Sequence, residues 1–281
     1  MKPIVNWDVL VTLNRPLMSG DPSAHNWDDS ADLYNIMAQM ERSYTYNQLN
    51  CFDVAPQDTV LDIGCGPGRI SCAISEKAKS VTALDAFPKM LEYCKKNAAE
   101  RSLTNINPHL LNWHDAELGK NIEQHDIVIA SRSVGMHDIY KLNAFAKKYA
   151  VIICWANAPS IPPILNELFA GCHPDRKAFG NGGGILSDRR AGYNATWNMV
   201  YDMGADPNIN IVTDGFTKTF LNYDEAYAYL RQILPFEEEY LPRFKKNLTP
   251  YLTEEPNGHV TFRRETKSYV LWWKPVQLEN T

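Results

Sequence analysis

Residues 59–70 read TVLDIGCGPGRI, and this stretch decides the fold. A short apolar run leads to the acid Asp62, three glycines follow at alternate positions from residue 64, and a helical pattern begins after them. This order is typical of a buried parallel strand that turns sharply into a helix. Glycine permits the sharp turn, and it lets a ligand approach the backbone where a Cβ would stand in the way. The stretch therefore predicts an α/β fold with a ligand at this turn.

The spacing of the glycines argues against a dinucleotide-binding loop, which requires G-x-G-x-x-G or G-x-G-x-x-A. Read from Gly64, the third small residue would fall at Arg69, and read from Gly66 it would fall at Ser71. The pattern here is D-x-G-x-G-x-G, which resembles motif I of the class I methyltransferases that use S-adenosylmethionine (SAM). The resemblance implies SAM as the cofactor, methyl transfer as the activity and S-adenosylhomocysteine as the product.

A second short strand, residues 79–85, ends in an acid about 20 residues after the glycine loop, where α/β nucleotide-binding units place the carboxylate that binds ribose. We therefore expect Asp85 to hold the cofactor ribose through charge-assisted hydrogen bonds. A helical pattern follows, with Pro88 in its first turn, where proline is tolerated. The family pattern here is D-x-S-x-x-M-L, so Ala86 replaces the common serine, and Met90 is retained against the adenine or as core packing.

A third segment, residues 106–116, passes from a strand into a polar turn that the resemblance places beside the adenine. Two alignments are open. Asn112 and Trp113 match a D-W variant of the family pattern, and Asp115 with Ala116 matches the G-D-A pattern. We favour the first alignment because an aromatic face suits a purine and the strand ends there, with core packing as the alternative for Trp113.

A fourth segment carries an apolar strand, residues 127–130, that emerges into a polar stretch. Ligands of open α/β sheets bind outside the carboxyl ends of the strands. The resemblance places the methionine part of the cofactor and the methyl acceptor here, so we expect Ser131, Arg132, Met136 and His137 on this side. A neutral imidazole suits a general base near physiological pH. His137 is the candidate base and His173 a second one, and the catalytic residue is otherwise unassigned.

These segments together give a set of expected cofactor-binding residues. The loop backbone would contact the methionine moiety of SAM, with Asp62 near its amino group. The full set is Asp62, Gly64, Cys65, Gly66, Gly68, Asp85, Ala86, Met90, Asn112, Trp113 and Ser131. No metal site is expected, because the cysteines show no C-x-x-C spacing and Cys172 with His173 offers only two adjacent ligands.

The implied fold is a three-layer α/β/α Rossmann-like methyltransferase sheet. We expect seven mostly parallel strands, with an antiparallel last strand between the fifth and the sixth. Residues 1–50 would form an N-terminal helical extension or lid, in which Trp27, Ala31 and Tyr34 resemble a W…A…Y element of the family. Residues 51–156 would form the SAM-binding core.

The rest of the chain would add an insertion and complete the sheet. Residues 157–215 form the insertion after the fifth strand, which we expect to cap the acceptor side. Residues 216–281 would supply a helix and a C-terminal β-hairpin, with strands at 258–263 and 268–274 around a charged turn.

Composition bounds the function. The 281 residues carry a formal net charge of −5, which gives no electrostatic footprint for nucleic acid. An N/D-P-P-Y/F motif, typical of enzymes that methylate amino groups of nucleic acid or protein glutamine, is absent. We therefore expect a small-molecule acceptor, and neither a nucleic-acid nor a membrane partner.

The six cysteines suggest reduced thiols in a cytoplasmic protein. A non-enzymatic SAM-binding protein and an NAD-dependent oxidoreductase remain as alternative functions. The position of Arg69 in the glycine frame disfavours the oxidoreductase.

Overall fold

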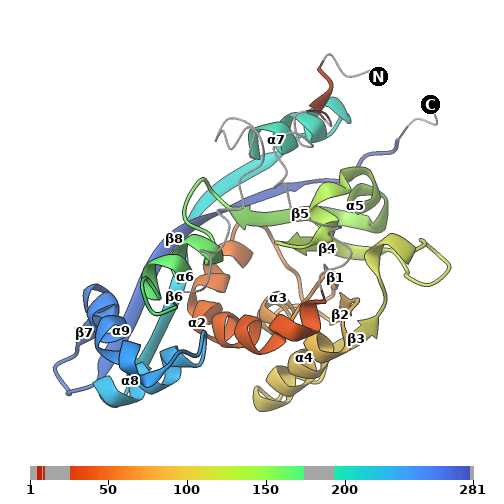
Figure 1. Cartoon of the computed structure of the whole chain (residues 1–281). Helices are drawn as coiled ribbons and strands as arrows, with labels where there is room; N and C mark the ends of the chain where they lie inside the picture. Colours follow the sequence, from red (N-terminus) through yellow and green to blue (C-terminus); the bar gives the residue numbers. More distant parts are fainter. Residues whose placement is uncertain (1–4, 8, 10–25, 174–192, 279–281) are drawn as a thin grey trace.

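The computed structural model describes residues 5–7, 9, 26–173 and 193–278 (Figure 1). Its eight strands form one sheet in the order β3-β2-β1-β4-β5-β8-β6, and β7 pairs with β8 off this path. The strands are β1 (Thr59–Ile63), β2 (Ser80–Asp85), β3 (Ile106–Leu110), β4 (His125–Ser131), β5 (Ala146–Trp155), β6 (Asn208–Phe220), β7 (Leu252–Glu254) and β8 (Val260–Trp273).

The helices lie on both faces of this sheet (Figure 1). The longer ones are α2 (Ala31–Leu49), α3 (Arg69–Ile74), α4 (Pro88–Glu100), α5 (Ile139–Phe145), α6 (Ile161–Leu168), α7 (Tyr193–Asp202), α8 (Tyr223–Arg231) and α9 (Leu241–Leu248). Three short 3₁₀ turns stand near the carboxyl ends of the strands: η2 (Trp27–Ser30), η3 (Trp113–Asp115) and η4 (Val134–His137).

The strand directions are those of the expected methyltransferase sheet. Strands β1 to β5 are mutually parallel, and β8 runs antiparallel between β5 and β6. The Rossmann-like fold is thereby confirmed, with its antiparallel last strand in the expected place. The expected count of seven strands is one too low, because the three-residue β7 adds to the far end of β8.

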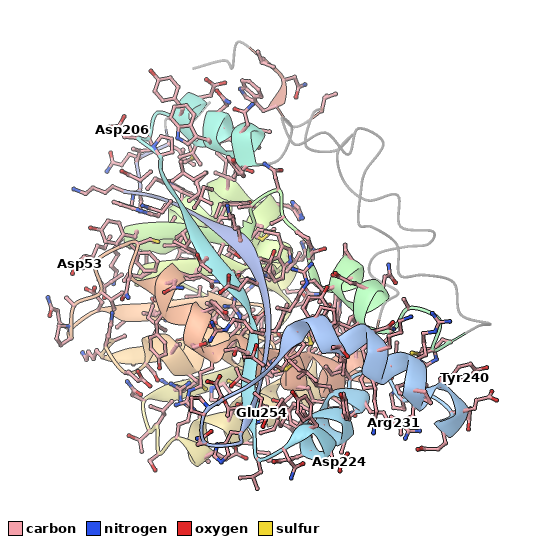
Figure 2. All side chains as sticks on the ribbon, turned by 90° about the vertical axis from the view of Figure 1, so that its left-hand side faces the viewer. Asp53, Asp206, Asp224, Arg231, Tyr240 and Glu254 are labelled. Atoms are coloured by element: carbon pink, nitrogen blue, oxygen red, sulfur yellow. The ribbon has the colours of Figure 1, made fainter. Side chains whose placement is uncertain are left out.

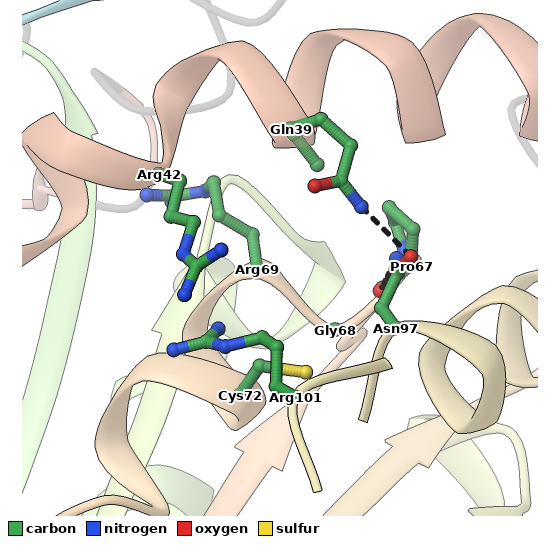
Figure 3. Close-up of a pocket in the computed structure, with 9 residues that line it drawn as sticks. Gln39, Arg42, Pro67, Gly68, Arg69, Cys72, Asn97 and Arg101 are labelled. Atoms are coloured by element: carbon green, nitrogen blue, oxygen red, sulfur yellow. Dashed lines mark hydrogen bonds between the residues drawn. The ribbon is translucent and has the colours of Figure 1, made fainter. Parts of the chain in front are cut away.

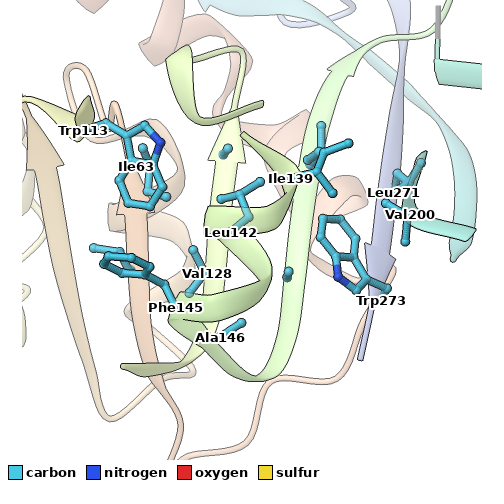
Figure 4. Packing of buried hydrophobic residues seen from close by; sticks show 14 of the residues in the cluster. Ile63, Trp113, Val128, Ile139, Leu142, Phe145, Ala146, Val200, Leu271 and Trp273 are labelled. Carbon is cyan, nitrogen blue, oxygen red and sulfur yellow. The ribbon is translucent and has the colours of Figure 1, made fainter. Parts of the chain in front are cut away.

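Apolar layers above and below the sheet explain why its central strands are stable. Val128 of β4 packs on one face with residues of α5 and α7, and Ile129 packs on the other face with residues of α2 and α3. Strands buried on both faces read as continuous apolar runs, as β4 and β5 do. Figure 4 shows the α5 side of this core, where Leu142 and Phe145 lie against the sheet beside Trp113 and Trp273.

The expected C-terminal hairpin is wrong. Residues 258–274 contain no turn inside them, because β8 is a single strand that pairs with β6 along the whole length of β6. The charged residues 263–267 read RRETK and include no Gly, Pro, Asn or Asp, the residues that favour a tight turn. Their side chains alternate in environment instead. Arg263, Glu265 and Lys267 are exposed, whereas Thr266 is buried and Arg264 bonds Glu167 on α6.

The long pair β6–β8 carries a second hydrophobic cluster beyond the parallel sheet. Strand β5 pairs only with residues 268–273 of β8, so the rest of β8 continues with β6 past the end of β5. Figure 2 shows the pair crossing the molecule from the side of Asp206 to the side of Glu254. Helices α6, α8 and α9 pack on this extension together with α2.

The insertion differs from its expected bounds. Helices α6 and α7 occupy it, but its expected end at residue 215 falls inside β6, which begins at Asn208. Its middle, residues 174–192 with the glycine run at 180–184, lies outside the described residues, as do most residues before α2.

Candidate functional site

The glycine loop joins β1 to α3 at the carboxyl edge of the sheet. Gly64, Gly66 and Gly68 all have positive φ angles, of 64°, 53° and 85°. A Cβ at Gly64 would lie 2.6 Å from Ser133 Cβ, and one at Gly68 would lie 2.7 Å from Cys94 Sγ, so both glycines permit close packing. A Cβ at Gly66 would meet only the sulfur of Met90, at 4.0 Å. Gly66 is therefore the glycine whose backbone is open to a ligand.

Asp85 ties the end of β2 to this loop. One carboxylate oxygen accepts the Gly66 N–H at 2.8 Å, and the other accepts the Phe87 N–H at 3.0 Å. Burial raises the pKa of the Asp85 carboxyl above its usual value, while these backbone donors act in the opposite direction. Each carboxylate oxygen keeps accepting capacity beyond its one backbone bond. The carboxylate thus fits a ribose diol beside the open backbone of Gly66.

Asp62 lies under the loop. Its side chain is 1% exposed and accepts the Ser71 hydroxyl at 2.6 Å, which holds the first turn of α3 against β1. Burial raises the pKa of this carboxyl to about 6. Its expected place near the amino group of SAM stays a prediction.

The remaining expected cofactor residues divide into exposed and buried positions. Ala86 and Asn112 are exposed, and Asn112 caps η3 by accepting the His114 N–H at 3.0 Å. Cys65 and Met90 are buried beside the loop, and burial contributes to raising the pKa of the Cys65 thiol, after the contact with Cys94. All four lie on segments that follow β1, β2 or β3, so the fold brings them to one edge of the sheet.

Trp113 does not present an open aromatic face. Its side chain is 1% exposed, its ring packs edge-on against Phe145 at 5.1 Å, and the Lys141 ammonium lies 4.4 Å from the ring centroid. The indole is part of the core (Figure 4), so the expectation that it covers the purine is wrong and the packing alternative holds. An aromatic ring that directly follows an apolar strand packs into the hydrophobic core and is then not open to a ligand.

The polar side chains at the end of β4 and directly after it form contacts with other protein groups. The Ser131 hydroxyl accepts a hydrogen bond from Arg69 at 2.7 Å. Arg132 was expected on the acceptor side, but its side chain is only 14% exposed, pairs with Glu41 and Asp214, and stacks over Trp155 at 3.3 Å. Its backbone has φ of 53°, a left-handed conformation that these contacts hold in place.

A buried ionic network connects four elements that are distant in sequence. Its charged members are Glu41 of α2, Arg69 of α3, Arg132 after β4 and Asp214 of β6, two acids and two bases. Glu41 bonds both arginines, at 3.0 and 2.7 Å, and Gln48 accepts from Arg69 at 2.7 Å and donates to Asp214 at 2.8 Å. The network fixes α2 over the strand ends.

Sequence reasoning missed this network. No local pattern links residue 41 to residue 214, and Glu41 reads as an ordinary polar residue of a helix. The sequence offers one signal for it: an arginine directly follows each of two segments that are expected beside the ligand. Arg69 follows the glycine loop, and Arg132 follows strand β4.

The N-terminal segment covers the start of α4 beside Asp85. Asp28 accepts the Lys89 N–H at 3.0 Å, and Asp32 pairs with the Lys89 ammonium at 3.0 Å. The Trp27 and Tyr34 rings meet edge-on at 5.3 Å. The residues expected to form a lid therefore lie next to the predicted ribose position, and the closing motion of a lid stays a prediction.

The two candidate bases are separated in the structure. His137 is exposed at the end of η4, on the segment that follows β4, together with the half-buried Met136. His173 lies between the rings of Phe169 and Phe236, whose centroids are 6.5 and 6.1 Å from its own. Both phenylalanines belong to the second hydrophobic cluster, so His173 is not at the strand ends and His137 is the remaining candidate.

Comparison with known families agrees with this geometry. Residues 55–160 match the family model of a methyltransferase domain. This range contains the glycine loop, Asp85, η3 and the ends of β4 and β5. Residues 55–160 are thus a methyltransferase domain of the class I, Rossmann-like type, whose cofactor is SAM.

Curated relatives share parts of this domain. A protein named probable cobalt-precorrin-6B C(15)-methyltransferase (decarboxylating), from Methanobrevibacter smithii, is 36% identical over 80 residues, which are 28% of this chain and 42% of that protein. The 23S rRNA (uracil(1939)-C(5))-methyltransferase of Francisella tularensis subsp. novicida is 22% identical over 112 residues, 38% of this chain and 25% of that enzyme. The chain thus spans less than half the length of these two relatives.

A solved structure is also similar. Haemonchus contortus phosphoethanolamine N-methyltransferase 1, in complex with phosphoethanolamine and S-adenosylhomocysteine, aligns with a TM-score of 0.48 and 14% identity, over 100% of this chain and 52% of that one. Among the described helices, none combines the length and apolar character that a membrane crossing needs. Within the same residues, no three His, Cys, Asp or Glu side chains gather as a metal site requires.

Proposed function

We propose that this protein transfers a methyl group from SAM to a small-molecule acceptor by in-line displacement. The observation that carries the proposal is the pairing of the Asp85 carboxylate with the Gly66 N–H beside an open loop backbone. SAM supplies a methyl group activated by its sulfonium centre. The protein therefore has to bind and orient SAM and the acceptor, and to exclude water from them.

The residues divide these tasks by position. Asp85 would bind the ribose hydroxyls, the open backbone at Gly66 would face the methionine moiety, and the exposed Asn112 would lie near the adenine. His137 would accept a proton from an oxygen or nitrogen acceptor at the end of β4. A carbon or thiol acceptor would need no such base.

A small acceptor is supported by charge. The net charge of −5 does not favour a polyanion. The two relatives act by name on a precorrin and on ribosomal RNA, so the comparisons leave both classes of acceptor in view. We propose a small-molecule acceptor. A transfer assay with methyl-labelled SAM, offered small molecules and total RNA in parallel, distinguishes the two classes of acceptor.

The first test is calorimetric titration of the purified protein with SAM, S-adenosylhomocysteine and NADH. We expect binding of the first two at micromolar concentration and none of NADH. Binding of NADH alone would instead support the oxidoreductase alternative. Binding of SAM without transfer to any acceptor would support a non-enzymatic SAM-binding protein.

Replacement of Asp85 tests the ribose position. Asp85→Asn should weaken SAM binding by about tenfold or more, since it removes charge-assisted hydrogen bonds worth about 1.5–3 kcal/mol each. Asp206→Asn, which changes an exposed acid away from the loop, is the matched control and should leave the affinity unchanged. Unchanged affinity in a folded Asp85→Asn protein would show that the ribose lies elsewhere.

A further inference from the structure

A small pocket lies behind the glycine loop, between three helices. Its walls come from α2, from Pro67 and Gly68 of the loop, from the first turns of α3, and from the end of α4 (Figure 3). The charged residues of the lining are Arg42, Arg69 and Arg101, and the lining contains no carboxylate. Glu41 pairs with Arg69 and Glu76 with Arg101 from outside the lining, so Arg42 is the arginine of this pocket without an acid partner among the described residues.

This pocket lies behind the glycine loop, and Gly68 is the one expected cofactor residue in its lining. The cofactor site lies at the carboxyl ends of the strands, where α4 begins directly after β2. Arg101 caps the opposite end of α4, and 13 helical residues span about 20 Å. Asn97, which also lines the pocket, holds the back of the loop by donating to the Pro67 carbonyl at 2.8 Å.

The three arginines differ in how far their donors are satisfied. Arg69 is occupied by Glu41, Gln48, Thr45 and Ser131. Arg101 pairs through one terminal nitrogen with Glu76 and Tyr46, but its Nε is buried and makes no hydrogen bond within the described part of the chain.

Arg42 is exposed, and no described residue accepts a hydrogen bond from it. Figure 3 shows the Arg42 and Arg101 guanidinium groups extending into the same space from α2 and from the end of α4. An oxyanion would supply an acceptor for the buried Arg101 Nε and for the Arg42 guanidinium.

We propose that this pocket binds a small oxyanion of the phosphate class, bridged by Arg42 and Arg101. Planar guanidinium groups bind phosphate oxygens through two parallel hydrogen bonds, which makes arginine the usual residue for this task. The anion is either inorganic phosphate or the phosphate of a small monoester. Once bound, it links α2 to α3 and α4, the helices that support the cofactor loop.

The test is a titration of the full chain with sodium phosphate at constant ionic strength, followed by thermal unfolding, with and without saturating S-adenosylhomocysteine. We expect a saturable rise of the unfolding temperature in both conditions, because the pocket shares only Gly68 with the expected cofactor residues. Arg42→Gln should weaken phosphate binding by about tenfold, the effect of losing charge-assisted hydrogen bonds. Arg243→Gln, which removes an exposed arginine of α9, is the control and should bind phosphate as the unaltered protein does.

Arg101→Lys keeps a cation beside Glu76 but removes the buried Nε donor, so it should also lower the affinity while the protein stays folded. No saturable effect of phosphate on the unaltered protein, or an equal effect in Arg42→Gln, would overturn the proposal. An equal response to acetate would overturn the assignment to the phosphate class. Glycerol phosphate distinguishes the two possible ligands, a phosphate monoester and the free phosphate ion. Tighter binding of glycerol phosphate than of inorganic phosphate identifies a monoester, and weaker or equal binding identifies the free ion. Either result supports the site.

Discussion

Asp62 shows how one residue sets a pH dependence from beneath the site. The carboxyl is buried under the glycine loop, and its pKa is raised from 3.8 to about 6 by burial. The folded protein therefore holds this proton more tightly than the unfolded chain does. Ionisation of Asp62 consequently lowers the free energy of unfolding as the pH rises from about 4 to about 6. Above that range Asp62 causes no further change in this free energy.

Asp62→Asn should remove this dependence. The amide keeps an oxygen that can accept the Ser71 hydroxyl, but it does not ionise. We expect the variant to gain stability relative to the unaltered protein as the pH rises through this window, by at most about 3 kcal/mol for a shift of about two pKa units. Urea unfolding at several pH values between 4 and 8 measures the difference. A difference that does not change with pH would contradict a raised Asp62 pKa.

At the scale of elements, the buried ionic network holds α2 in place. Its two acids and two arginines balance, so removing one acid leaves both arginines without full compensation in a buried setting. Breaking a buried pair from one side costs about 3–5 kcal/mol, far more than an exposed pair contributes.

Glu41→Gln should therefore lower the free energy of unfolding by about 3 kcal/mol. Glu117→Gln breaks the exposed pair with Lys120 and should change the stability by less than about 1 kcal/mol. Urea unfolding of both variants at neutral pH makes the comparison. Adding Arg132→Gln to Glu41→Gln should cost less than the sum of the single changes, because the two residues share one interaction. Additive costs would show that the network does not act as a unit.

The elements also show what the sequence could predict. Strands β1, β2 and β4 were predictable because in each a short apolar run carries a polar residue at or near its end, and for β1 turn glycines follow directly. The hairpin was wrong because charge in residues 263–267 resembled a turn, whereas β8 presents these side chains at a half-exposed surface. Trp113 and Arg132 were misplaced because packing and ion pairing depend on α5, α2 and β6, which lie far away in sequence.

Across the whole molecule, stability should be uneven. Strands β1, β4 and β5 are buried on both faces and paired on both edges, whereas β3 is an edge strand in which no residue is fully buried. Strand β7 has three residues and one partner. Hydrogen exchange slows with burial and pairing of the backbone.

Native-state hydrogen exchange should therefore show the slowest amides in β1, β4 and β5, and the fastest strand amides in β7 and β3. Mass spectrometry after peptic digestion resolves these segments. Slow exchange in β7 comparable to that in β4 would mean that the extension of β6 and β8 is as stable as the parallel core.

The position of β8 also bears on how the chain is synthesised. This strand follows every other strand in the sequence, yet it lies between β5 and β6. Until residues 260–273 have left the ribosome, β5 has an open edge and β6 has no neighbour to pair with. Open edges invite pairing with other chains. The edge of β5 consequently stays open to other chains until β8 joins the sheet.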